Sequence, residues 1–169
     1  MSNDINLNIT DDSGVLSLVD CAAYRTFVSE DWDYDGITAH FQTQMSLRSI
    51  LVWHCGDGGG EYSVTFRDHM TSDTGYREVV GAIEATSNRL HLVSYNALTM
   101  AAQFEDELLP SKHERDLVIA VEPGRYNVRI VQLYNPDKAG FARKRKPHFL
   151  IELALGQSAI WSNVAWALE

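Results

Sequence analysis

Apolar and polar residues alternate along most of this chain in short runs that are separated by turn-forming residues. The clearest example extends from Leu117 to Leu133, where two apolar stretches flank Pro123 and Gly124. Proline presets its own φ and glycine accepts a positive φ, so this pair suits a type II turn between two strands. Such a turn matches strand twist less well than the primed turns. We therefore expect that the two strands can diverge into different sheets.

The same alternation predicts several further strands. We expect strands at residues 14–20, 37–54 (with a break at Arg48 and Ser49), 61–67, 76–85, 90–95 and 148–155, and a last one within residues 160–168. In the third of these, Tyr62, Val64 and Phe66 share the inward face. Short loops suggest that residues 53–66 form one hairpin, and that Ser87 and Asn88 turn a second one between residues 76 and 95.

One stretch has helical rather than alternating spacing. Five apolar residues share one helical face before Pro110 stops the run: Leu98, Ala101, Ala102, Phe104 and Leu108. The fold class that follows is mainly β, an antiparallel β-sandwich with one short helix near residues 97–108. Residues 1–13 are expected to form a flexible N-terminal segment, and residues 14–169 a single β-sandwich domain.

The composition narrows the choice of partner and compartment. Apolar residues make up 45% of the chain, charged residues 22%, and the net charge is −9. Such a charge repels nucleic acid and anionic membranes, and it favours encounter with a basic protein. There is no run of membrane-spanning length and no secretory signal, so we expect a cytoplasmic protein. Cys21 and Cys55 are expected to be buried thiols, with a single disulfide as the alternative.

The sharpest local pattern is the acidic, aromatic stretch that we call the acidic loop. It consists of Asp31, Trp32, Asp33, Tyr34 and Asp35, followed by Gly36. Carboxylates can pair with the Lys and Arg residues of a partner, and aromatic residues supply anchors, so these five are the candidate partner-binding residues. The alternative is a calcium- or carbohydrate-binding module that uses Asp31, Asp33 and Asp35. The opening matches an EF-hand loop, but its twelfth position is Gln42 rather than a bidentate Glu.

No pattern in the chain predicts a catalytic residue, a metal site or a cofactor. An enzyme that uses Cys55 with His40 or His54 is the weakest of our hypotheses, because nothing in the spacing brings these side chains together. The six histidines lack zinc-ligand spacing. The glycine-rich residues 56–60 lack the Lys-Ser/Thr of a P-loop and are expected to form a flexible loop. We therefore predict a protein that is not an enzyme.

A basic tetrad interrupts the acidic sequence at Arg143, Lys144, Arg145 and Lys146. It can contact phosphate groups or an acidic protein, but the remaining chain is then still more acidic, which argues against nucleic acid as a partner. We favour a solvated hairpin tip.

The order of these segments resembles the competence protein J family, the bacterial DNA-entry nuclease inhibitors. The similar segments are residues 24–35, 40–53, 78–94, 117–130 with its Pro123-Gly124-x-Tyr126, and 148–155. The chain departs from the pattern by an insertion around residues 101–113 and by the basic tetrad. No functional motif of the family transfers to particular positions here.

The resemblance implies a small cytoplasmic protein of inhibitor or immunity type that binds and blocks another protein, such as a nuclease. Nucleases present basic clefts, and an acidic inhibitor can imitate the phosphate backbone. The net charge of −9 is consistent with this implication.

Overall fold

The computed structural model describes residues 4–138, 144–156 and 164–166. Its elements, in chain order, are β1 (Ile5–Asp11), β2 (Val15–Val19), α1 (Tyr34–Ser46), β3 (Ile50–His54), β4 (Gly60–Arg67), β5 (Arg77–Ala85), β6 (Arg89–Ser94), α2 (Tyr95–Gln103), β7 (Val118–Ala120), β8 (Gly124–Gln132), a short 3₁₀ helix η1 (Pro136–Lys138) and β9 (Phe149–Leu155). None of the described helices is long and apolar enough to cross a membrane.

The strands form two sheets that pack as a sandwich. One sheet has the order β1-β4-β9-β8-β5, and the other has the order β3-β2-β6-β7. The four-stranded sheet is antiparallel throughout, whereas β4 and β9 of the five-stranded sheet run parallel. The predicted antiparallel sandwich is therefore correct in its layers but wrong for this pair of strands.

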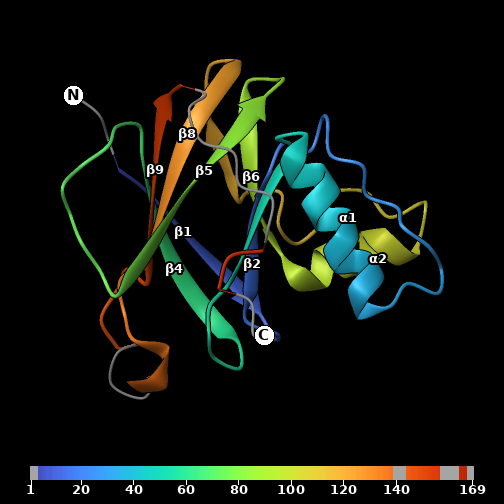
Figure 1. The fold of residues 1–169 in the computed structure, drawn as a ribbon, viewed down its shortest axis with the longest axis horizontal. Helices are drawn as coiled ribbons and strands as arrows, with labels where there is room; N and C mark the ends of the chain where they lie inside the picture. Colours follow the sequence, from blue (N-terminus) through green and yellow to red (C-terminus); the bar gives the residue numbers. More distant parts are fainter. Residues whose placement is uncertain (1–3, 139–143, 157–163, 167–169) are drawn as a thin grey trace.

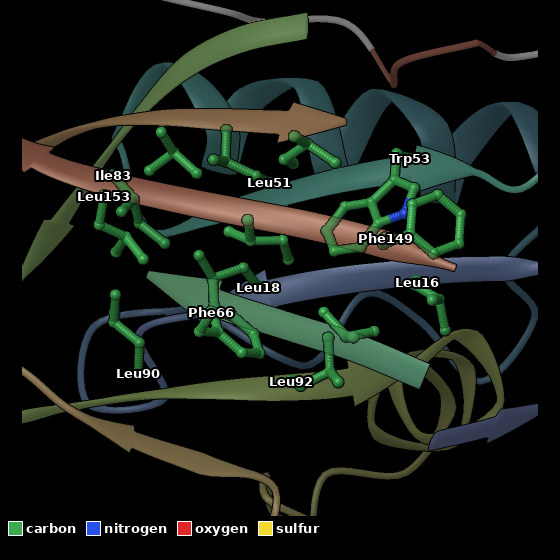
Figure 2. Packing of buried hydrophobic residues seen from close by; sticks show 14 of the residues in the cluster. Leu16, Leu18, Leu51, Trp53, Phe66, Ile83, Leu90, Leu92, Phe149 and Leu153 are labelled. Carbon is green, nitrogen blue, oxygen red and sulfur yellow. The ribbon is translucent and has the colours of Figure 1, made fainter. Parts of the chain in front are cut away.

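The main core lies between the two sheets. Leu16 and Leu18 of β2 and Trp53 of β3 point toward Phe66 of β4 and Phe149 of β9. Figure 2 shows the indole of Trp53 beside the ring of Phe149, and their centroids lie 6.1 Å apart. Both residues are fully buried, so this contact is completely withdrawn from water.

The two helices cover the outer face of the four-stranded sheet and add a third layer (Figure 1). Ile37, Phe41 and Met45 of α1 are buried against that face, together with Leu98 and Ala102 of α2. The three α1 residues are spaced at i, i+4 and i+8, which places them on one side of a helix. A second core therefore lies between the sheet and the helices.

The prediction of a long strand over residues 37–54 is half wrong. Its first part is the helix α1, and only its second part, β3, is a strand. The apparent alternation around Phe41 fits a period of two over a few residues, but the buried positions have helical spacing. The predicted break is confirmed, because Arg48 has a φ of 61° between the two elements.

The predicted helix near residues 97–108 is confirmed in part, since α2 spans Tyr95–Gln103 and ends before Phe104. The prediction that residues 1–13 are flexible is wrong for residues 5–11. These residues form β1, and each of them pairs with a residue of β4. Backbone pairing thus orders a stretch that its polar composition suggested was loose.

Two predicted hairpins are not formed. β3 and β4 lie in different sheets, as do β5 and β6. The expected divergence at Pro123 and Gly124 is confirmed, because β7 belongs to the four-stranded sheet and β8 to the other. The short turns after β1, β3, β5 and β7 therefore each carry the chain from one sheet to the other.

Ala165 lies along the edge of the four-stranded sheet. Ala165 forms a parallel bridge with Trp53, and its backbone bonds to Val52 and His54 at 3.0 and 2.9 Å. The last strand predicted within residues 160–168 is represented among the described residues by this single bridge, and residues 160–163 and 167–168 lie outside the described residues.

Candidate functional site

The acidic loop forms the start of α1. Asp33 is the N-cap residue, and its Oδ1 accepts a hydrogen bond of 2.6 Å from the backbone N–H of Gly36. Asp35 lies in the first turn, where the helix dipole favours a negative charge. The Ser29 hydroxyl accepts a hydrogen bond of 3.2 Å from the Asp31 amide and shapes the approach to the helix. The loop is therefore held by local hydrogen bonds.

The five predicted partner-binding residues lie together but do not all face solvent. Asp31, Asp33 and Asp35 are exposed, and the Tyr34 side chain is 55% exposed. Trp32 is partly buried and packs against the core beneath the helices. Three carboxylates and one tyrosine thus form the outer surface, while the tryptophan supports it from below.

The alternative use of the loop as a calcium site is not supported by its geometry. Asp33 uses one carboxylate oxygen as the helix cap, and the loop leads directly into α1 rather than around an ion. Across residues 4–138, 144–156 and 164–166, no group of three or more His, Cys, Asp or Glu side chains is arranged to hold a metal. The aspartates instead suit the start of a helix, where Asp33 is the cap and Asp35 lies in the first turn.

A cavity of about 240 Å³, which we call the α1 pocket, lies beside the acidic loop. It opens between α1, α2 and the ends of β2 and β3. Its polar and aromatic lining comes from Ser13, Tyr34, Thr38, Phe41, His54 and Tyr95. Burial lowers the pKa of His54, and the nearby Arg77 adds to this effect, so the imidazole is neutral at pH 7.

Two buried carboxylates hold the start of α2 behind the α1 pocket. Asp11 accepts hydrogen bonds from the amides of Ser13 and Val15, each at 3.0 Å, and from Asn96 at 3.1 Å. Glu114 accepts one from the amide of Ser94 at 3.2 Å. Burial raises the pKa of Glu114, hydrogen bonds from Ser94 oppose that effect, and the charge of Asp11 adds to it.

Cys55 and His40, which the enzyme hypothesis named, lie in different surroundings. Cys55 is fully buried, and neither Cys21 nor Cys55 forms a disulfide. His40 lies on α1 and contacts the carbonyl of Arg25 at 2.6 Å. Burial and the adjacent Asp20 raise the pKa of Cys21 to about 12, so its thiolate is scarce at neutral pH. The expected buried thiol is correct for Cys55, whereas Cys21 is only partly buried.

Residues 56–60, which the sequence predicts to be a flexible loop, are held by hydrogen bonds to the side chain of Asp57. The hydroxyls of Tyr62 and Tyr134 both donate to the carboxylate of Asp57, the second at 2.7 Å. The His148 ring packs edge-on against both tyrosines. The shared contact with Asp57 joins Tyr62 of β4 to Tyr134 in the segment after β8. These tyrosines are far apart in the sequence, so only folding brings them together.

A larger groove of about 790 Å³ lies at β7 and shares no lining residue with the α1 pocket. Its lining includes Phe66, Met70, Ile119, Tyr126 and Leu155.

The predicted basic tetrad is described only in part, since Arg143 lies outside the described residues. Lys144, Arg145 and Lys146 are exposed.

Comparison with protein-family models and with characterised proteins gives no match. Two solved structures have a similar fold. One is described as crocagin biosynthetic gene J, with 12% identity, a TM-score of 0.62, and coverage of 93% of this chain and 99% of its own. The other is ComJ from Bacillus subtilis, described as the inhibitor of the DNA degrading activity of NucA, with 9% identity, a TM-score of 0.49, and coverage of 92% and 99%.

ComJ, whose family the sequence resembles, is one of these two matches. The likeness to crocagin biosynthetic protein J shows the arrangement of strands and helices and nothing of the chemistry. The chain is thus a mainly β protein with two sheets and two helices, in a fold similar to that of crocagin biosynthetic protein J.

Proposed function

We propose that this chain is a non-enzymatic, protein-binding β-sandwich of the inhibitor or immunity type, and that it acts in the cytoplasm. Its acidic loop binds a basic partner protein. The observation that carries this proposal is the placement of three exposed aspartates and the exposed Tyr34 on one capped helix start. A nuclease is the class of partner that the sequence resemblance implies.

The charge of the chain supports binding to a basic surface. A net charge of −9 raises the rate of encounter with a cationic protein, and this effect weakens as salt is added. The capped helix holds Asp31 and Asp35 in place before binding, so little conformational entropy is lost when they pair with Lys or Arg. Tyr34 adds an aromatic contact of the kind that dominates many interfaces.

The test uses proteins encoded by neighbouring genes, each co-expressed with this chain. We expect the wild-type chain to retain a basic partner. The double variant Asp31→Asn/Asp35→Asn is expected to associate with that partner about tenfold more slowly at low salt. Asp33 is left intact because it caps α1.

A matched control removes the same charge elsewhere. Glu105→Gln/Glu107→Gln alters two exposed carboxylates beyond the end of α2. Equal association rates for the two double variants would mean that net charge alone acts and that the acidic loop is not the contact surface. Retention of no protein from any neighbouring gene would also count against the proposal.

A further inference from the structure

Two buried carboxylates lie at the start of α2 without an ion pair to a Lys or Arg among residues 4–138, 144–156 and 164–166, although the neighbouring His113 lowers the pKa of Glu114. Asp11 is 2% exposed and Glu114 is 8% exposed. Each accepts hydrogen bonds from backbone amides, and neither forms an ion pair with a described Lys or Arg. Buried carboxylates are normally paired with a cation, because removal from water is costly. The pair therefore leaves a negative potential inside the molecule.

The α1 pocket lies directly in front of these carboxylates. Ser13 and Val15 line the pocket, and their amides donate to Asp11. Tyr95 also lines it, and the amide of the next residue, Asn96, donates to the same carboxylate. Only one layer of residues thus separates the pocket from Asp11.

Four carboxylates lie around the α1 pocket, although two helices begin beside it. A helix start is equivalent to about half an elementary positive charge. Asp33 and Asp35 offset the start of α1, while Asp11 and Glu114 offset that of α2. No Lys or Arg is part of the described lining, and the nearby cation is Arg77, which donates to the carbonyl of the lining residue His54 at 3.4 Å. A cation entering the pocket would therefore meet more negative than positive charge.

The walls of the pocket suit a flat cation. Tyr34 and Tyr95 contribute aromatic rings from the two helices, and Phe41 packs against Tyr95 with centroids 6.4 Å apart. Guanidinium groups stack on aromatic faces and are more weakly hydrated than ammonium groups. A volume of about 240 Å³ fits a single long side chain rather than a folded segment.

We propose that the α1 pocket receives an arginine side chain of the basic partner. Its guanidinium group packs against Tyr34 and Tyr95, and its charge balances Asp11 and Glu114. This inference rests on the proposed function and adds to it the residue type that the partner inserts beside the acidic loop.

The test uses N-acetyl-arginine amide as the probe and needs no partner protein. In an NMR titration we expect saturable shifts of the backbone signals of Tyr34, Thr38 and Tyr95. N-acetyl-citrulline amide, which has the same shape without the charge, is expected to bind about tenfold or more weakly. Absence of saturable shifts at these residues, or equal binding of citrulline, would overturn the proposal. Tighter binding of N-acetyl-lysine amide would overturn the assignment to arginine.

Two variants test the roles of the charge and the ring. Glu114→Gln keeps an acceptor for the Ser94 amide but removes the charge, and Tyr34→Ser removes the ring at the mouth of the pocket. Both are expected to weaken binding of the arginine probe several-fold. Tyr76→Ser, at an exposed tyrosine outside the pocket, is the matched control and is expected to bind as the wild type does. The proposal would be contradicted if Glu114→Gln and Tyr34→Ser bound the arginine probe as tightly as Tyr76→Ser does.

The two proposals fail separately. If the arginine probe does not bind while Asp31→Asn/Asp35→Asn still slows association with the partner, the pocket assignment falls and the proposed function stands. If the probe binds but no basic partner is retained, the pocket is real and the proposed function falls.

Discussion

Single residues decide where α1 starts and how it is held. Asp33 accepts the Gly36 amide and satisfies one of the backbone donors that every helix start leaves open. We expect Asp33→Ala to lower the free energy of unfolding by about 1 kcal/mol, and Asp33→Ser to have a much smaller effect, since serine also caps helices. Urea denaturation of both variants measures this difference. Asp31→Ala, at an exposed position that does not cap, should leave the urea midpoint nearly unchanged.

Glu114 makes stability depend on pH in an unusual direction for a carboxyl group. Burial and the nearby Asp11 raise its pKa in the folded chain above the unfolded value, so ionisation of Glu114 opposes folding. Its favourable contribution is complete below the unfolded pKa of about 4.3 and is lost as the pH rises through the raised folded pKa.

We therefore expect Glu114→Gln to melt at a higher temperature than the wild type at pH 8, because the amide keeps the hydrogen bond to Ser94 without the buried charge. The difference should shrink toward pH 4. Thermal melts from pH 4 to 8 measure it, with Glu105→Gln as the exposed control. A variant that is less stable than the wild type at pH 8 would show that the charge itself is needed for folding.

At the scale of elements, the alternation of apolar and polar residues in short segments predicts most strands, but it does not predict which strands pair. The alternation of Tyr62, Val64 and Phe66 identified β4 and its inward face, because that face is buried against one core. One of the two partners of β4, the strand β9, lies more than 80 residues away and runs parallel to it, as the register Val64↔Phe149 shows. Pairings over such distances depend on the whole core and leave no local pattern.

The same limit explains the helix that the sequence pattern missed. Ile37, Phe41 and Met45 have helical spacing, but the residues between them also alternate, so both periods fit a short window. Asp33, an N-cap residue type three positions before Gly36, is the local signal for a helix start in this stretch.

An ion-pair network joins β5, β8 and β9 on the outer face of the five-stranded sheet. Arg129 donates to Glu78 at 2.5 Å and to Glu152 at 2.6 Å. Residues 68–75 cross this face, where Thr71 donates to Glu152 and the carbonyl of Asp73 accepts from Arg129. Burial alone raises the pKa of Glu152, but these hydrogen bonds outweigh burial and hold it below its ordinary value.

Removal of one partner from this network should be costly. We expect Glu152→Ala to lower the free energy of unfolding by about 3 kcal/mol, since it removes the fully buried carboxylate partner of Arg129 and leaves that guanidinium with the exposed Glu78. Glu84→Ala breaks the exposed pair with Arg125 and should cost less than about 1 kcal/mol. Denaturant unfolding compares the two variants, and similar losses would mean that burial does not set the strength of these pairs.

At the scale of the whole molecule, three layers place the candidate site at one end of the helical layer. The acidic loop was predictable because its five residues are consecutive. The α1 pocket and its buried carboxylates were not, because Asp11, His54, Tyr95 and Glu114 come from four separate segments. Only the packing of α1 and α2 on the sheet brings these segments together.

The bridge between Ala165 and Trp53 also affects how copies of the chain meet one another. An open strand edge offers a row of backbone donors and acceptors on which a neighbouring copy can build. Ala165 already bonds to the backbone groups of Val52 and His54 on the outer side of β3. Because Ala165 already occupies these backbone groups, a second copy of the chain cannot pair with the edge of β3 at Val52 and His54.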